Sequence, residues 1–243
     1  PIKSSAASDV YKRQMYNIQH TVTPNNGVLE VKLECIRPDM EIHYTTDGSE
    51  PTATSPLYEK IVPVKEALTL KGATFAHGRQ MGKTLILPAR WNLATAKPVL
   101  GTNPAEKLLT NGIRGSLKYS DFEWCSWADN DSVSFTIDLL KPEMLNTLIL
   151  GCITNNGMAI HKPASVRVEV SDDNSKFREA VVQSFTSEEI FREGNFIENL
   201  SLKLGGTQAR YVRVTAKGPG VCPASHVRPG QTSRIFFDEV MLE

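Results

Sequence analysis

The sequence of 243 residues lacks the patterns that mark several large classes of protein. Lysine and arginine number 27, as do aspartate and glutamate, so the net charge is zero and no basic block exists to neutralise phosphates. Nucleic-acid binding is therefore not expected. No apolar run approaches the ~20 residues of a membrane-spanning helix, so we expect no membrane insertion. No nucleophile-elbow, zinc-protease, P-loop or dinucleotide motif appears either, and we assign no catalytic residues.

Cysteine is also scarce. Cys35, Cys125, Cys152 and Cys222 are far apart and form no Cys-x-x-Cys pair, so a structural zinc site is not expected. Two alternatives stay open for the four thiols. They form two bridges in a secreted protein, or they are free and buried as small apolar side chains.

The first fourteen residues differ from the rest. Pro1–Gln14 has neither the apolar core of a signal peptide nor the alternation of a strand. Its string SSAASDVYKRQ resembles translated sequencing-adapter sequence. We therefore expect residues 1–14 to be an artefact, disordered and outside the fold, and the coding sequence to continue upstream.

Residues 15–89 show short strands separated by turns. Val28–Cys35 and Met40–Thr45 alternate apolar and polar residues, as half-buried strands do. Ala67–Ala76 and Gln80–Leu87 are two further predicted strands, and a Thr-Asp-Gly-Ser turn lies between the pairs. Strands at this spacing indicate a small β-sandwich.

Residues 90–243 form a second and larger β region. Only Ser187–Arg192 is predicted to be helical. Alternation or continuous apolar character predicts strands at Val133–Leu139, Leu145–Ile153, Ser165–Ser171, Leu200–Leu204, Ala209–Ala216 and Ile235–Leu242. The sum indicates a jelly roll of about eight strands.

The segment Tyr44–Pro51 (YTTDGSEP), with the later LTLKGATFAHGRQMGKT, resembles the chitobiase/β-hexosaminidase C-terminal domain. The resemblance implies a small fibronectin-like sandwich that acts as a spacer after the catalytic barrels of bacterial glycosidases. Asp47 and Glu50 are then turn residues rather than an acid/base pair.

In the second region, NLATAKPV, LLTNGIRGS, VRVEVSDDNSKF, ARYVRVTA and FFDEVMLE resemble, in that order, the coagulation factor 5/8 type C (discoidin-like) domain of family 32 carbohydrate-binding modules. TNGIRGSLKYSDFEW and CPASHVRPGQTSRIFFDEV resemble the C-terminal module of Bacteroidetes β-N-acetylhexosaminidases of glycoside hydrolase family 20. The expected fold is all-β: a small fibronectin-like β-sandwich at 15–89, then a discoidin-type β-sandwich jelly roll at 90–243.

The discoidin resemblance implies a structural Ca²⁺ ion at the loop Lys107–Ser116. The matching ligands are Leu108, Asn111, Ser116 and Glu239, all offering the hard oxygens that Ca²⁺ prefers. Asn111 stands where the family has aspartate, so one negative charge is lost and weaker binding is expected. The alternative is an ordinary hydrogen-bonded turn with positive φ at Asn-Gly.

Carbohydrate binding is the second implication, because sugar faces pack on exposed aromatic rings. Trp127 is the aromatic candidate, with core packing as the alternative, whereas Trp124 is expected to be buried. In the loop Thr154–Pro163, His161 could donate to a sugar hydroxyl or be an ordinary surface histidine. Ala159 in that loop replaces a tryptophan common in the hexosaminidase-type module, which would weaken sugar binding.

The 18-residue segment Lys217–Arg234 has no predicted regular structure, and long irregular segments in compact domains are often functional. His226, Arg228 and Arg234 are its candidate sugar-binding side chains. The alternative is a packed loop in which Cys222 is buried.

Asp238-Glu239 superficially matches the catalytic Asp-Glu pair of family 20 hexosaminidases. The preceding residues are Phe-Phe rather than His-x-Gly-Gly, and neighbours on a strand point to opposite faces. A catalytic (β/α)₈ barrel also needs about 250 residues and alternating helices.

The sequence therefore predicts a non-catalytic accessory region, spacer plus carbohydrate-binding module, of a secreted β-N-acetylhexosaminidase that removes terminal GlcNAc or GalNAc. The chain itself is not expected to be an enzyme. Expected partners are glycans containing GlcNAc, GalNAc or Gal and the enzyme's own barrel, at a secreted, periplasmic or cell-surface location. The alternatives are a stand-alone glycan- or protein-binding adhesion module and a free-standing enzyme of unrecognised type.

Overall fold

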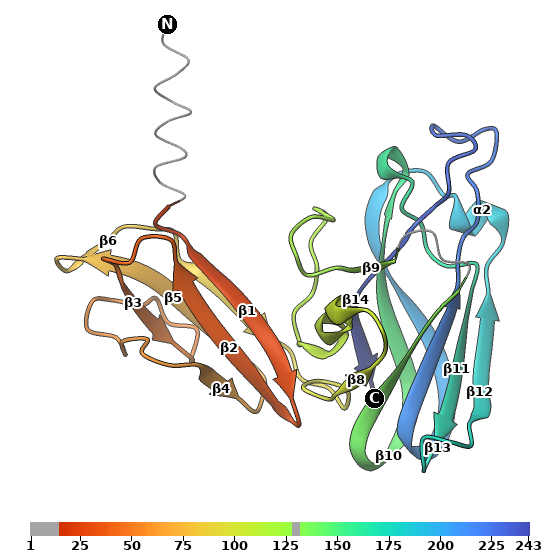
Figure 1. The fold of residues 1–243 in the computed structure, drawn as a ribbon, viewed down its shortest axis with the longest axis horizontal. Helices are drawn as coiled ribbons and strands as arrows, with labels where there is room; N and C mark the ends of the chain where they lie inside the picture. Colours follow the sequence, from red (N-terminus) through yellow and green to blue (C-terminus); the bar gives the residue numbers. More distant parts are fainter. Residues whose placement is uncertain (1–14, 128–131) are drawn as a thin grey trace, which may run out of the picture. The chain divides into compact units, whose positions relative to one another are not determined.

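A computed structural model describes residues 15–127 and 132–243. The expectation for residues 1–14 lies outside the described residues. The chain divides into two compact units. Of the described residues, the first unit contains 15–23 and Val28–Arg90, and the second contains Pro24–Gly27 and those from Trp91 to Glu243. Each unit is built from antiparallel strands (Figure 1), so the predicted all-β fold class is confirmed.

The first unit contains two small sheets, ordered β1-β2-β4 and β3-β5-β6, with β7 also paired to β5. Gly72 of β5 faces Ile18 and Leu33 of the other sheet, so the two sheets pack together as a sandwich. Its strands are β1 (Ile18–Asn25), β2 (Val28–Cys35), β3 (Glu41–Thr45), β4 (Val62–Val64), β5 (Leu68–Ala76), β6 (Arg79–Gln80) and β7 (Leu85–Ala89).

The second unit contains a seven-stranded sheet ordered β12-β11-β13-β10-β14-β9, with β8 paired to β10. Its strands are β8 (Val99–Leu100), β9 (Cys125–Trp127), β10 (Ser132–Asn155), β11 (Ser165–Ser171), β12 (Arg178–Ser184), β13 (Asn195–Lys217) and β14 (Ile235–Leu242). Three short helical turns complete it: η1 (Pro104–Thr110), η2 (Asn156–Met158) and α2 (Ser187–Ile190). The predicted helix at Ser187–Arg192 is found as α2, which ends at Ile190, whereas η1 and η2 were not predicted. Thr186 and Glu189 form a capping box at the start of α2.

The long strands β10 and β13 each bend in the middle. In β10 the register shifts between Asp138 and Glu143, where Leu140 has a positive φ of 71°. A second register shift lies between Leu145 and Thr147, and opposite it Gly205 and Gly206 of β13 have positive φ, which glycine adopts without steric cost. The bends fold one sheet back on itself, so each strand contributes to both layers of the sandwich.

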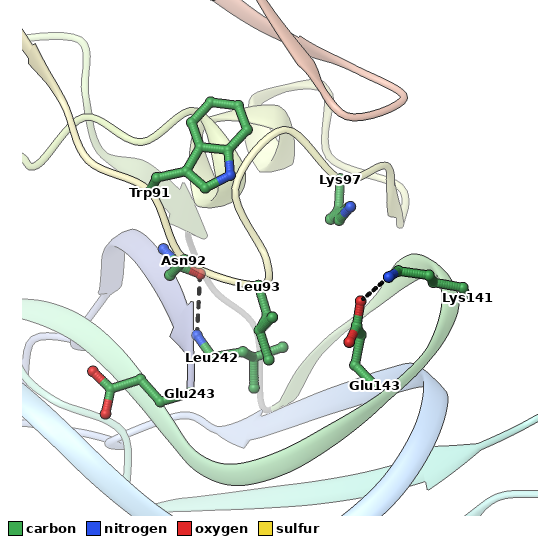
Figure 2. Close-up of a pocket in the computed structure, with 8 residues that line it drawn as sticks. All are labelled: Trp91, Asn92, Leu93, Lys97, Lys141, Glu143, Leu242 and Glu243. Atoms are coloured by element: carbon green, nitrogen blue, oxygen red, sulfur yellow. Dashed lines mark hydrogen bonds and ion pairs between the residues drawn. The ribbon is translucent and has the colours of Figure 1, made fainter. Parts of the chain in front are cut away.

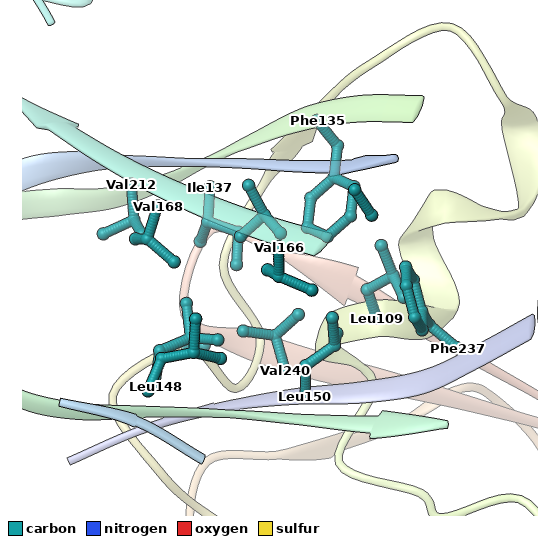
Figure 3. Packing of buried hydrophobic residues seen from close by; sticks show 14 of the residues in the cluster. Leu109, Phe135, Ile137, Leu148, Leu150, Val166, Val168, Val212, Phe237 and Val240 are labelled. Atoms are coloured by element: carbon teal, nitrogen blue, oxygen red, sulfur yellow. The ribbon is translucent and has the colours of Figure 1, made fainter. Parts of the chain in front are cut away.

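The core of the second unit lies between the two halves of these bent strands (Figure 3). Phe135 and Ile137 come from the first half of β10, and Leu148 and Leu150 from the second half face them across the core. Val240 of β14 fills the space beside them. The buried positions of β10, and of β14, which is buried on both faces, therefore close the jelly roll and fix where its connecting loops emerge.

All four cysteines are free, three of them buried and Cys35 half-buried, in line with the free-thiol alternative. A helix long and apolar enough to cross a bilayer is not found among the described residues.

Candidate functional site

Three irregular segments meet at one end of the second unit: the turn after β10, the α2 region and the segment that precedes β14 (Figure 1). Backbone hydrogen bonds hold them together. The Asn156 amide donates to Gly194 at 3.2 Å, and the His161 amide donates to Arg234 at 3.1 Å. The sequence-predicted loops Thr154–Pro163 and Lys217–Arg234 are therefore neighbours in space.

His161 and His226, both predicted to bind sugar, are buried at this end rather than exposed. Their Nε2 atoms lie 3.2 Å apart, and the Arg228 amide donates to His226 Nδ1 at 3.0 Å. Phe191 packs against both rings. Burial, followed by the neighbouring His226, lowers the pKa of His161 to about 4. The structure thus places both imidazoles in the interior, where their ring nitrogens have protein neighbours, rather than on the surface expected from the sequence.

The two predicted arginines differ in their surroundings. Arg228 is exposed and contacts Gln231 at 3.2 Å. Arg234 is half-buried: its guanidinium lies 5.5 Å from the centre of the Phe236 ring, and Nη2 donates to the Met158 carbonyl at 3.4 Å. The Nε of Arg234 is buried without a hydrogen-bond partner. Arg234 thus combines a half-buried guanidinium with an aromatic neighbour, and such surroundings suit a contact with a ligand.

Trp127 is a core residue, which is the core-packing alternative to a sugar platform. Its ring is 8% exposed, stacks on Phe135 with centroids 6.2 Å apart and meets Phe237 edge-on at 5.6 Å. A hydrogen bond from its side chain to the buried Glu106 satisfies the polar edge of the indole. Both faces of the ring are therefore unavailable to a glycan.

Two aromatic residues that the sequence analysis did not weigh lie in the loop before β9. Phe122 is 87% exposed and has a positive φ of 71°. Tyr119 is half-buried and meets Phe236 edge-on, with centroids 6.1 Å apart. A signal was present in the sequence, because both rings interrupt a polar stretch rich in Ser, Asp and Lys. We name Tyr119, Met158 and Arg234, which gather around Phe236, the aromatic loop surface.

The predicted calcium residues lie on one loop and on β14. Glu239 is buried, and both its carboxylate oxygens accept from the Gly112 amide, at 3.2 and 3.1 Å. Asn111 is buried too; its Oδ1 accepts from Ile113 and its Nδ2 donates to Glu123. The Leu108 carbonyl accepts from the Asn111 amide at 3.4 Å, which is the backbone bond of an ordinary turn.

Glu239 has the character of a cation ligand. Its burial, followed by the charge of Asp238, raises the pKa of its carboxyl well above the usual value. A divalent cation would remove this cost, and the predicted ligands offer the carboxylate, amide and carbonyl oxygens that Ca²⁺ prefers. By their chemistry these residues fit the ion. Ser116 is exposed, and its Oγ accepts from the Lys118 amide at 3.2 Å.

Asp238, the neighbour of Glu239, binds a different group. Its Oδ2 accepts from Arg114 Nε at 2.6 Å and from the Gly115 amide at 3.0 Å. Gly151 of β10 leaves room for this pair, because a Cβ there would overlap the Asp238 carboxylate. The two adjacent carboxylates thus hold separate parts of the same loop, which gives each a structural role.

A separate pocket lies at the other end of the unit, where its chain begins and β14 ends (Figure 2). It measures about 510 Å³ and contains none of the predicted site residues. Lys141 pairs with Glu143 at 3.2 Å on its rim, and Asn92 accepts from the Leu242 amide at 3.1 Å in its wall. Trp91, Leu93, Lys97 and Glu243 complete the lining.

A β-sandwich whose polar and aromatic side chains gather on irregular loops at one end has the architecture of a binding module. Family comparison agrees with this class. The chain belongs to the F5/8 type C domain family, whose model matches residues 94–227, more than half of its length. The model of the Chitobiase/beta-hexosaminidase C-terminal domain matches residues 24–85. The resemblances to the chitobiase/β-hexosaminidase C-terminal domain and to the factor 5/8 type C domain are thereby confirmed, whereas the narrower resemblance to family 20 hexosaminidases stays a prediction.

Solved structures show more distant likeness. A fucose binding module of Streptococcus pneumoniae is 18% identical over 63% of this chain and 97% of its own, with a TM-score of 0.39. The lectin domain of lectinolysin complexed with Lewis B antigen is 15% identical over 63% and 96%, with a TM-score of 0.41. The C-terminal domain of a chitobiase from Bacteroides fragilis is 16% identical over 54% and 76%, with a TM-score of 0.32. Sequence identities and TM-scores this low give no information about the function of the chain. No curated protein sequence matches the chain.

Proposed function

We propose that the chain is a glycan-binding accessory region of a larger glycosidase. The observation that carries the proposal is the order of its two matched families, a chitobiase/β-hexosaminidase C-terminal domain followed by an F5/8 type C domain. A spacer that holds a binding module beside a catalytic domain raises the local concentration of substrate even when each single contact is weak.

The aromatic loop surface supports glycan contact. Tyr119 offers a partly open ring on which the C–H face of a sugar can pack. Arg234 lies beside it, with guanidinium N–H groups that suit sugar hydroxyls. Phe122, fully projecting from the same loop as Tyr119, offers a second ring. Ala159 is buried, so the position that carries tryptophan in related modules adds no ring here.

Binding to immobilised glycans that end in GlcNAc, GalNAc or Gal tests the proposal. We expect Arg234→Gln and Tyr119→Ala each to weaken binding by about tenfold or more, since a lost polar or stacking contact changes affinity by at least about 1.4 kcal/mol. Arg79→Ala, an exposed arginine of the first unit, is the matched control and should leave affinity unchanged. The unfolding midpoint of each variant checks its fold.

Two results would contradict this assignment. If Trp91→Ala abolishes binding while Arg234→Gln does not, the glycan occupies the pocket of Figure 2 instead. If the wild-type chain binds no glycan on the array, the glycan-binding proposal falls and a protein-binding adhesion module becomes the better interpretation.

We further propose that the larger enzyme is a secreted β-N-acetylhexosaminidase of glycoside hydrolase family 20. It would act on terminal GlcNAc or GalNAc, at the cell surface, in the periplasm or outside the cell. The order of the two matched families supports it. Resequencing the locus upstream of codon 15 tests it. We expect a barrel-length reading frame with His-x-Gly-Gly-Asp-Glu, and a signal peptide directly before Met15 would contradict it.

A structural Ca²⁺ ion is part of the same proposal. Glu239 would supply the charge, with the side-chain oxygen of Asn111, the Leu108 carbonyl and the Ser116 hydroxyl as the remaining protein ligands. The ion would neutralise the buried carboxylate and brace the loop that also carries Tyr119. The buried and poorly compensated Glu239 supports this assignment.

A further inference from the structure

The buried end of the loop segment before β14 contains a group of metal-binding side chains. One nitrogen of His161, one nitrogen of His226 and the sulfur of Cys222 lie within 4.8 Å of one another. All three side chains are buried. Among residues 15–127 and 132–243, this is the one place where three His, Cys or carboxylate groups gather in this way. We propose that it is a mononuclear site for a divalent transition metal, and that the ion is Zn²⁺.

The donor atoms match the chemistry of zinc. Imidazole nitrogen and thiolate sulfur are its usual protein ligands, bound at about 2.0–2.1 and 2.3 Å. Two nitrogens at that distance in a tetrahedral shell lie about 3.4 Å apart. The Nε2 atoms of His161 and His226 are 3.2 Å apart, so they already have nearly the required spacing. With three protein ligands, a water molecule would take the fourth position.

The two ligands of the loop segment are held by a short, well-bonded turn. The Cys222 amide donates to Gln231 at 2.9 Å, and the Gly230 amide donates back to Cys222 at 3.0 Å. The His226 amide donates to Pro223 at 3.0 Å. Cys222 and His226, four residues apart, therefore face the same interior space. The hydroxyl of Ser233, 3.3 Å from the Cys222 sulfur, can donate to a thiolate.

The metal-free arrangement shows what must change when the ion binds. Because the Arg228 amide donates to His226 Nδ1, the ring proton of His226 is on Nε2 and points to His161 Nε2. Zn²⁺ takes the position of that proton. The ring proton moves to Nδ1, the Arg228 amide turns away, and the thiol proton of Cys222 passes to solvent. Arg228 is exposed and lies two residues before Gly230, which has positive φ, so this turn can rearrange.

The surroundings of His161 Nδ1 are a second observation in favour of the site. Its Nδ1 is buried and has no well-formed hydrogen bond, although the backbone of Ile190 lies near enough to affect its pKa. When Nε2 binds a metal, Nδ1 carries the ring proton, and a backbone carbonyl is the common partner of such a proton. Ile190 is in place to take this role.

The site would join two segments that backbone hydrogen bonds already hold side by side. His161 follows the turn after β10, whereas Cys222 and His226 belong to the segment before β14. The aromatic loop surface uses Met158 and Arg234 from the same two segments. The ion would therefore act as a cross-link beneath that surface. This inference does not depend on glycan binding, and its readout below involves no glycan.

The test titrates the chelator-treated chain with Co²⁺, which substitutes for zinc and gives visible absorption. We expect one Co²⁺ per chain, with tetrahedral bands and a thiolate-to-metal band that Zn²⁺ abolishes. Cys222→Ser should lose the thiolate band. His226→Ala should bind about 100-fold more weakly or worse, because one of three ligands is missing. His226 lies in a loop segment, so this variant keeps the test valid even if His161→Ala does not fold.

Cys35→Ser and His77→Ala are the matched controls, since they remove a half-buried thiol and an exposed imidazole far along the chain from the group. Both should behave as the wild type. Unfolding midpoints in chelator establish that all variants fold. The proposal is overturned if wild type binds no Co²⁺, if the thiolate band survives in Cys222→Ser, or if Cys35→Ser removes it.

Discussion

Replacing Asp238 with alanine should lower the free energy of unfolding of the second unit by about 3–5 kcal/mol. The Asp238 carboxylate is fully buried and accepts from Arg114 and Gly115, at 2.6 and 3.0 Å, and from the Glu239 amide at 2.7 Å. Removing it leaves the largely buried Arg114 guanidinium without its anion. Loss of one partner from a buried ion pair is among the most destabilising single substitutions.

Tryptophan fluorescence during denaturant unfolding measures this effect in the right unit, because Trp91, Trp124 and Trp127 all belong to the second unit. Glu179→Ala is the matched control. It removes an exposed partner of Arg167, 3.4 Å away, and should change stability by at most about 1 kcal/mol. Equal losses in the two variants would contradict a special role for the buried pair.

Calcium should stabilise the second unit by about 2.7 kcal/mol when its free concentration is 100 times the dissociation constant. The physical reason is the buried Glu239 carboxylate, which accepts a hydrogen bond from the Gly112 amide but has no cation at ion-pair distance among the described residues. Glu239→Gln should abolish the response, because the amide cannot supply the charge. The measurement compares unfolding midpoints in Ca²⁺ and in a calcium-selective chelator.

The same pair of proteins in chelator gives the internal control. There Glu239→Gln should be close to the wild type in stability, since it removes a buried charge whose ionisation is already disfavoured. Mg²⁺ should have little effect, because it demands a tighter octahedral shell. A full calcium response in Glu239→Gln would show that the ion binds elsewhere.

The sequence predicted most of the strands because their side chains alternate. β2, β11 and β14 have the predicted bounds. In β2 and β11 one face is buried and the other is more exposed, whereas β14 is buried on both faces. Gln80–Leu87 failed as a single strand and is split into β6 and β7. The polar strand β12 was missed, because its half-exposed residues give no apolar alternation.

The bends in β10 and β13 could not be predicted from the alternation of apolar and polar residues either. The sequence predicted two strands in place of each, on either side of the bend. Alternation locates a strand but does not show whether the strand continues across a bulge. That continuation depends on the backbone conformation of Leu140 in β10 and of Gly205 and Gly206 in β13. Only the pairing of the two bent strands shows that each is a single element.

For the site, the sequence identified the correct loops but not the burial of their side chains. His161 and His226 were taken as surface groups because residues in polar loops are usually exposed. Their contact spans 65 positions of the chain, and no local pattern encodes it. Tyr119 and Phe122 were missed, although both rings interrupt a polar stretch. For Trp127 the polar neighbours in sequence left the sugar-platform and core alternatives open, and the structure places it in the core.

The bent strands have a mechanical consequence. Because β10 and β13 run through both layers and remain paired on either side of their bends, neither layer can peel away without opening the other. The second unit should therefore resist partial melting and unfold in one cooperative step. Such a module keeps its loops in place until the whole sandwich gives way, which suits a domain tethered to a substrate that pulls on it.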